Sequence, residues 1–169
     1  PSKEHYLVDI SRNIRIAHTS VKQNLSRLVK LGLVKKELQK KGKRSFPIYK
    51  SNSASKSFRE YKLVYNLASL LESGLIGFLE DKIATKVIIV FVSYRRGEDV
   101  EGSDIDLFLE GIEERIDLSN FERKLKRKIQ LHFKEDFRSY PKELKNNIIN
   151  GVVLYGFLEG YKWLLKYNQ

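Results

Sequence analysis

The chain has 169 residues, of which 41% are hydrophobic, and its formal net charge is +11. This length allows one buried core or two small modules of fewer than about a hundred residues each. The absence of cysteine excludes disulfides and thiolate metal sites, and no apolar run reaches the roughly twenty residues that a membrane span needs. Without a recognisable signal peptide, the sequence predicts a cytoplasmic protein with no membrane segment. Since the sequence does not begin with methionine, we expect it to be part of a longer chain.

The positive charge is concentrated in the first third of the chain. Residues 1–57 contain fourteen lysine and arginine residues against three acidic ones, whereas residues 58–169 contain eighteen of each kind. A basic module joined to a neutral one indicates an N-terminal unit that binds a polyanion and a C-terminal unit with a different function. The alternative is that a lysine-rich surface only makes the protein soluble.

Two helices are expected in the basic module. The apolar residues between Leu7 and Ile14 have helical spacing. Thr19 or Ser20 is the predicted N-cap of a second helix, from about Ser20 to Lys30, which Gly32 stops. The face of this second helix opposite its apolar stripe carries Thr19, Gln23, Ser26, Arg27 and Lys30. That face is polar and cationic, as the face of a helix lying in a DNA major groove would be.

Two strands follow, Leu33–Gln39 and Ser45–Lys50, and they are expected to form a hairpin. The predicted cationic tip of the hairpin consists of Lys40, Lys41, Gly42, Lys43 and Arg44. Two helices followed by a basic hairpin, with the segment LVKLGLVKK between them, resemble a winged helix-turn-helix domain.

This resemblance implies binding to double-stranded DNA. Gln23, Ser26 and Arg27 would contact base edges or phosphates, and the basic residues of the tip would contact the DNA backbone and make the affinity depend on salt. The resemblance also implies a first helix upstream of Pro1. The alternative is a winged helix that contacts a protein, because the fold alone does not determine the ligand.

The segment Ser51–Ser57 is short and polar, and we interpret it as a linker. The apolar pattern from Phe58 to Leu71 predicts a helix that ends near Gly74, and a shorter helix follows it. We expect these connecting helices, within residues 58–84, to pack against the second module. The alternative is that they pair with a copy of themselves in a homodimer.

The stretch from Val87 to Leu109 predicts a site. Its β-branched apolar run ends just before Ser93, which is expected to open a helix with free N–H groups. A second predicted strand follows, in which Asp104 and Asp106 alternate with apolar residues, so both carboxylates lie on one face of this strand. Two carboxylates held close together repel each other unless a cation lies between them, and they suit Mg²⁺ shared with phosphates.

Ten residues separate Ser93 from Asp104. This spacing resembles the Gly-Ser, ten-residue gap, Asp-x-Asp pattern of the minimal nucleotidyltransferases in the DNA polymerase β superfamily. The resemblance implies that Ser93 helps to bind a nucleoside triphosphate, and that Asp104 and Asp106 are catalytic residues that hold Mg²⁺ or Mn²⁺. Val92 departs from the pattern, because it stands where the family has a glycine that lets the backbone approach the phosphates.

Two arginines, Arg95 and Arg96, lie just beyond the serine. We expect them to neutralise phosphate charge in nucleotide binding. The alternative is that they are solvated residues of a helix.

The alternating segment Lys128–Phe133 predicts a third strand. In the resembled family a third carboxylate on this strand joins the other two, and Gln130 stands at the best-aligned position here. A neutral amide does not replace that charge. We therefore expect glutamine at this position to slow nucleotidyl transfer by orders of magnitude. His132 lies on the same predicted face and could serve as a base or as a metal ligand. The alternative is an ordinary strand histidine, because isolated histidines are usually not site residues.

The end of the chain predicts a helix starting at Pro141, a last strand over Val152–Phe157 and a helical tail around Trp163. The predicted fold is α+β or α/β. A winged helix-turn-helix domain at residues 1–57 is followed by connecting helices at 58–84. Residues 85–169 then form a nucleotidyltransferase-like mixed sheet with helices on one face.

The predicted function is that of a DNA-binding, transcription-regulator-like protein. Its second module would bind a nucleoside triphosphate with Mg²⁺ and transfer a nucleoside monophosphate to an acceptor. One alternative, based on Val92 and Gln130, is a degenerate transferase that acts only as a DNA- or protein-binding regulator. Another, implied by the resemblance, is an antitoxin that modifies a toxin, so that the partner would be a protein substrate.

Overall fold

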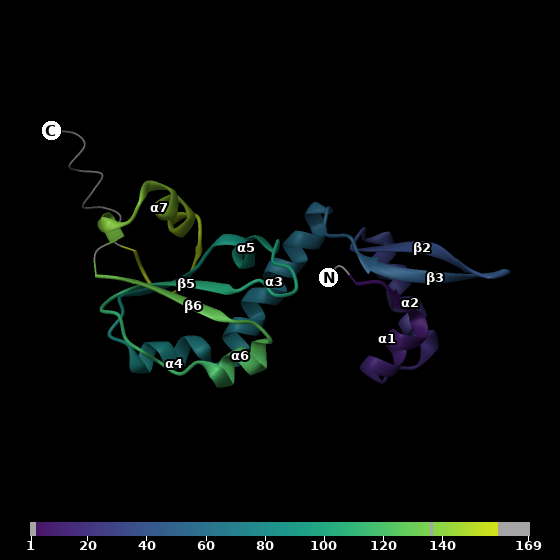
Figure 1. Ribbon diagram of the computed structural model, residues 1–169, viewed down its shortest axis with the longest axis horizontal. Coiled ribbons are helices and arrows are strands. Elements are labelled where there is room, and N and C mark those ends of the chain that lie inside the picture. Colours follow the sequence, from purple (N-terminus) through teal and green to yellow (C-terminus); the bar gives the residue numbers. More distant parts are fainter. Residues whose placement is uncertain (1–2, 136, 159–169) are drawn as a thin grey trace. The chain divides into compact units, whose positions relative to one another are not determined.

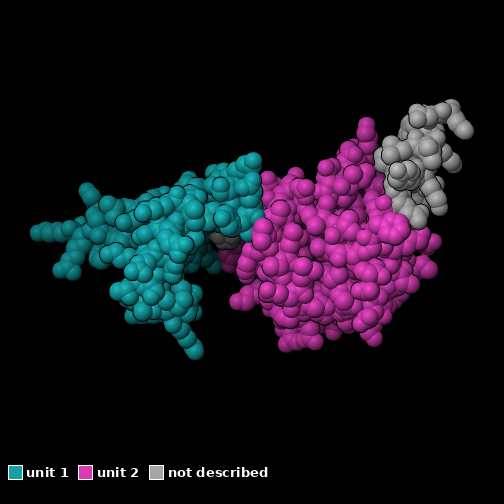
Figure 2. Space-filling view, turned by 180° about the vertical axis from the view of Figure 1, so that it is seen from behind, with its two compact units in different colours: residues 1–62 teal, residues 63–169 magenta. Residues whose placement is uncertain are grey.

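The computed structural model describes residues 3–135 and 137–158. The chain forms two compact units, Pro1–Lys62 and Leu63–Gln169 (Figure 2). We call them unit 1 and unit 2 and describe each by itself.

Unit 1 consists of two helices and a three-stranded antiparallel sheet. Its elements are β1 (His5–Tyr6), α1 (Leu7–Ile14), α2 (His18–Lys30), β2 (Val34–Lys41) and β3 (Arg44–Ser51). The strand order is β1-β3-β2, so the hairpin of β2 and β3 gains a third strand at its edge. The sequence did not predict β1, because a two-residue strand is too short to show alternation.

The core of unit 1 joins α2 to the sheet. Val21 and Leu25 lie four residues apart on one face of α2 and are buried against Tyr49 of β3. The predicted N-cap at Thr19 or Ser20 was wrong: α2 begins at His18, and the N–H of Val21 already donates to the carbonyl of Ala17 at 3.0 Å.

The hairpin is longer and its turn is tighter than the sequence predicted. Lys40 pairs with Ser45 and Lys41 with Arg44, so only Gly42 and Lys43 form the turn. Gly42 has φ 61°, a left-handed conformation that two-residue hairpin turns require and that glycine adopts without strain.

The segment after β3 is held by hydrogen bonds rather than being a free linker. The side-chain amide of Asn52 donates to the carbonyl of Gly32 at 2.8 Å, and its backbone N–H donates to the carbonyl of Leu33 at 2.9 Å. Helix α3 (Lys56–Ser73) then starts after only four residues, Asn52 to Ser55.

Unit 2 is built on a mixed four-stranded sheet in the order β6-β5-β4-β7. Its elements after α3 are α4 (Leu75–Lys82), β4 (Val87–Val90), α5 (Val92–Arg96), β5 (Ile105–Glu110), α6 (Ser119–Leu125), β6 (Ile129–Lys134), the 3₁₀ turn η1 (Phe137–Ser139), α7 (Lys142–Ile149) and β7 (Val152–Gly156). The β5–β6 pair is parallel, and the two other pairs are antiparallel. The mixed sheet, with strands near Val87, Ile105 and Ile129, was predicted.

Helices cover both faces of this sheet, whereas the sequence analysis expected them on one. Helices α4 and α6 lie on one side of the sheet and α7 on the other (Figure 1). The second layer is required because the side chains of Phe91 and Phe108 point to the α7 side and are almost wholly buried there, with Ile148 and Phe137. Apolar side chains on both faces need apolar cover on both.

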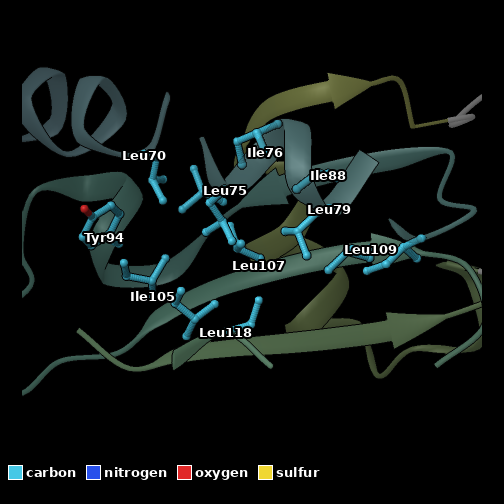
Figure 3. Close-up of a cluster of buried hydrophobic side chains, with 13 residues drawn as sticks. Leu70, Leu75, Ile76, Leu79, Ile88, Tyr94, Ile105, Leu107, Leu109 and Leu118 are labelled. Atoms are coloured by element: carbon cyan, nitrogen blue, oxygen red, sulfur yellow. The ribbon is translucent and has the colours of Figure 1, made fainter. Parts of the chain in front are cut away.

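The larger core lies between the sheet and the α4 side. Leu75 and Leu79 of α4 are fully buried against Ile105, Leu107 and Leu109 of β5, which alternate with residues of the opposite face (Figure 3). The end of α3 joins this core through Leu70, so the expected packing of residues 58–84 on the second module holds for α4 and for the end of α3.

Within the described residues, no single helix is long and apolar enough to span a membrane. Helices α3 and α4 pass that test of length and composition only as a pair bent by 52°. The helical tail predicted around Trp163 lies outside the described residues.

Candidate functional site

The start of β5 and the neighbouring β6 bring two aspartates onto one face of the sheet. Asp104 immediately precedes β5, and the N–H of Ile105 donates to the carbonyl of Lys128 at 2.8 Å, which fixes the register of the parallel pair. Ile105 and Leu107 are fully buried on the α4 side, so Asp106 between them points to the other face, where its side chain is 21% exposed.

The turn that contains Ser93 lies beside these aspartates. The N–H of Phe91 donates to the carbonyl of Asp106 at 3.2 Å, so the chain leaves β4 next to the second aspartate. Helix α5 begins at Val92, one residue before Ser93. The structure therefore brings the end of β4 and the Asp-x-Asp segment together, as the spacing predicted.

Val92 adopts the backbone conformation of a glycine. Its φ is 59°, in the left-handed region, which is a genuine outlier for a β-branched residue. The side chain is half-buried and packs against the Phe91 and Phe108 cluster. The turn thus keeps the shape that the family's glycine allows, although a valine stands in its place.

We expect Val92→Gly to be more stable than Val92→Ala by about 1 kcal/mol, the reverse of the usual order. Both variants lose the two γ-methyl groups of Val92, but only alanine keeps a β-carbon and with it the left-handed strain. Urea unfolding of the two proteins measures the difference. An alanine variant as stable as the glycine variant would contradict the left-handed conformation.

Each aspartate has a polar partner from β6. The side-chain amide of Gln130 donates to Oδ2 of Asp104, and Nε2 of His132 lies 3.0 Å from Oδ1 of Asp106. Gln130 and His132 are two residues apart on one strand and therefore share a face, so both carboxylates lie on that face with them. The ring of His132 also contacts Phe91 edge-on, at 5.3 Å between ring centroids. His132 is therefore part of the site.

This donor set fits one divalent cation better than two. Mg²⁺ is bound in proteins by one or two carboxylates together with phosphates, and Asp104 with Asp106 supplies the carboxylates. One oxygen of each is engaged by Gln130 or His132, and the other is left for a ligand. Among the described residues, no group of three or more His, Asp or Glu side chains could hold a metal ion.

Arg95 and Arg96 lie on α5, two and three residues after Ser93. Arg96 forms an ion pair with Glu98 at 3.1 Å, and both side chains are about half exposed, so the pair contributes little to stability. The Nε atom of Arg95 is buried without a hydrogen-bond partner among the described residues. A buried donor without a partner is costly. Of the two arginines, Arg95 is therefore the better candidate for contacting a bound anion.

A buried polar network supports the loop between α5 and β5. Oδ1 of Asp99 accepts a hydrogen bond from Asn66 of α3 at 2.8 Å, and Oδ2 accepts one from Arg127 at 3.3 Å. Asn66 also donates to the carbonyl of Tyr94 at 2.9 Å. The Asp99 side chain is only 1% exposed. The network ties α3, α5, the loop and the start of β6 together behind Ser93 and Asp104.

The sequence analysis did not identify this network. A signal was present in Asn66, which lies four residues before the buried Leu70 and thus on the apolar stripe of α3. Tyr94 lies beside the network, and burial raises its pKa to about 12, helped by the negative charge of Asp99. The Tyr94 hydroxyl is therefore neutral at physiological pH.

The residues of unit 1 that the sequence predicted to contact DNA lie on two surfaces. Thr19, Gln23 and Arg27 are exposed on α2, on the side away from Val21 and Leu25. Ser26 is exposed too, but its hydroxyl donates to the carbonyl of Lys22 at 2.9 Å.

The hairpin forms the second surface. Its exposed basic residues are Lys40, Lys41, Lys43 and Arg44. Lys41 extends over the ring of Tyr6, at 4.6 Å from the ring centroid, and so also has a structural role.

Residues 73–155 match the family model of the nucleotidyltransferase domain. The matched segment runs from the end of α3 to β7 and contains Ser93, both aspartates and Gln130. The match supports a nucleotidyltransferase domain in this part of the chain and a nucleotidyl-transfer type of function at the level of the family. Neither the curated proteins nor the solved structures contain a match to the chain.

Proposed function

We propose that unit 2 binds a nucleoside triphosphate with Mg²⁺ or Mn²⁺ and transfers its nucleoside monophosphate to an acceptor hydroxyl. The observation that carries this proposal is the pair of aspartates on one face of the sheet, beside a serine turn that keeps a glycine-like backbone. Asp104 and Asp106 would hold the cation, and Ser93 with Arg95 and Arg96 would hold the phosphates.

In such a transfer the acceptor oxygen forms a bond to the α-phosphorus, the bond from that phosphorus to the bridging oxygen breaks, and pyrophosphate leaves. A bound divalent cation would neutralise charge on the phosphate oxygens. The proton of the acceptor hydroxyl needs a base. His132 is the candidate, because its Nε2 lies 3.0 Å from Oδ1 of Asp106, on the face of the sheet that carries both aspartates.

We expect at least one of ATP, GTP, CTP and UTP to bind in the presence of Mg²⁺, with Asp106→Asn weakening that binding by at least about tenfold. The asparagine removes the charge that the cation requires. Titration calorimetry measures the affinity. Asp81→Asn is the matched control, because Asp81 is an exposed residue of α4 and its loss changes the net charge equally. Equal affinity in all three proteins would exclude the transferase proposal.

We propose that unit 1 is a winged helix-turn-helix domain that binds double-stranded DNA. The exposed polar residues of α2 would enter the major groove, and the basic hairpin would lie along the phosphates. The support is the element order of α1, α2 and a basic hairpin, together with the charge: residues 1–57 carry fourteen basic residues against three acidic ones.

Binding to duplex DNA is expected to weaken steeply with salt, and Lys40→Ala with Lys43→Ala should reduce the slope of log K against log[salt] by about 2. These two lysines are preferable to Lys41, which contacts Tyr6. Fluorescence anisotropy over a salt series measures the slope. The control is Lys82→Ala with Lys142→Ala, two exposed lysines of unit 2. A slope unchanged in the hairpin variant would argue against the wing contact.

A second function is favoured by Gln130. Its amide donates to Asp104 where the resembled family has a third carboxylate, so the site is suited to bind a nucleotide but lacks one group for transfer. The protein would then be a DNA-binding regulator with a nucleotide-binding unit. Nucleotide binding that depends on Asp106, without release of pyrophosphate, would identify this function.

A further inference from the structure

Unit 2 contains a cleft of about 500 Å³ beside the candidate site. It lies where the parallel strands β5 and β6 begin, between the loop before β5 and helix α6. Asp104 forms part of its wall, so the cleft adjoins the candidate site.

The residues that line the cleft carry an excess of positive charge. The charged ones are Asp104, Glu122, Arg123, Lys126, Arg127 and Lys128. Four basic residues therefore line the cleft with two acidic ones, although residues 58–169 as a whole contain as many acidic as basic residues. An excess of like charge in a concave site attracts anions.

Two of the four cations already have structural partners. Arg127 is paired with the buried Asp99 at 3.3 Å, and Lys128 is paired with Glu122 at 3.0 Å. Arg123 and Lys126 are both exposed. The guanidinium of Arg123 donates to the side-chain oxygen of Asn120. Because asparagine is neutral, this hydrogen bond does not neutralise the charge of Arg123.

The backbone at Lys126 ends helix α6. Lys126 has φ 53°, a left-handed conformation that closes a helix, as Arg15 with φ 54° does at the end of α1. After this turn the chain continues through Arg127 and Lys128, so three consecutive basic residues line the cleft.

We propose that this cleft is a second phosphate-binding site, which holds phosphate groups of a nucleic-acid strand or of a free nucleotide beside Asp104. In the first case the cleft would hold the acceptor strand of the proposed transfer, with its end next to the aspartates. Only this role rests on the proposed function; the binding of phosphate does not.

The test uses the full chain labelled with ¹⁵N, in EDTA so that no divalent cation contributes. Pyrophosphate, ATP and a single-stranded trinucleotide are titrated separately, and the amide shifts of Ser119–Lys128 are followed. Because Ser119–Lys128 belong to unit 2, shifts of these amides distinguish binding in the cleft from binding of the trinucleotide to unit 1. We expect pyrophosphate to shift these amides, and whichever of ATP or the trinucleotide shifts them at lower concentration identifies the source of the phosphate.

The variant Arg123→Gln with Lys126→Gln should weaken this binding by at least about tenfold. The charge-matched control Lys82→Gln with Lys142→Gln should leave it unchanged, and thermal unfolding of both variants checks that they fold. Asp106→Asn should show the same pyrophosphate-induced shifts as the unmodified protein. Phosphate binding in the cleft is therefore tested separately from the transferase proposal. Absence of pyrophosphate-induced shifts, or equal weakening in both double variants, would overturn the proposal.

Discussion

Replacing Arg127 by methionine is expected to lower the free energy of unfolding by about 3 kcal/mol. Methionine keeps much of the side-chain volume but removes the ion pair between Arg127 and the carboxylate of Asp99, which is buried at 1% exposure. Breaking a buried ion pair by removing one partner costs far more than an exposed ion pair contributes. Urea unfolding followed by circular dichroism measures the loss.

Two further variants separate charge from packing. Arg115→Met removes an exposed arginine from the same unit, and it should change stability by no more than about 0.5 kcal/mol. Adding Asp99→Asn to Arg127→Met should recover part of the loss, because asparagine still accepts the hydrogen bond of Asn66 without burying a charge. If Arg127→Met were as harmless as Arg115→Met, the network would not hold this loop in place.

Replacing Gln130 by aspartate should make the candidate site depend on a divalent cation. In EDTA the variant is expected to be less stable by about 1–2 kcal/mol, because a third carboxylate joins Asp104 and Asp106 and the amide donor is lost. Mg²⁺ or Mn²⁺ should restore the stability, adding about 2.7 kcal/mol at a hundred times the dissociation constant. Thermal unfolding with and without the cation measures the difference.

Catalysis provides the second readout of the same variant. If the third carboxylate is the missing group, release of pyrophosphate from the bound triphosphate should accelerate by about 10²-fold or more. Gln130→Asn is the control, because it changes the length of the side chain and leaves it neutral. Equal effects of Mg²⁺ on the aspartate and asparagine variants would show that Gln130 does not occupy a metal-ligand position.

Much of unit 2 could be predicted because its local patterns are strong. The alternation of Asp104 to Leu109 predicted both the strand and the face of the carboxylates, and the family resemblance carried by the ten-residue gap after Ser93 implied that the turn and the strand would meet. The burial of β4 on both faces is also visible in its continuous apolar run. The helix layer formed by α7 was not predicted, because α7 has few apolar residues and Ile148 alone is buried on it.

The contacts that escaped prediction are those between residues far apart in the sequence. Asn66 and Asp99 are 33 residues apart, and Asp99 stands in a charged stretch that gives no sign of burial. The family resemblance placed Gln130 beside the two aspartates, but the hydrogen bond from its amide to Asp104 was not predicted, because it depends on the register of β5 and β6. The left-handed conformation of Val92 runs against the preference of its own residue type.

That conformation bears on how readily a glycine could take the place of Val92. The codons of valine and glycine differ only in their middle base, so one point mutation would place a glycine in a backbone that already has the shape a glycine needs. No rearrangement of the neighbouring strands would have to accompany it. The turn after β4 is therefore a single base change away from a residue that its backbone conformation favours.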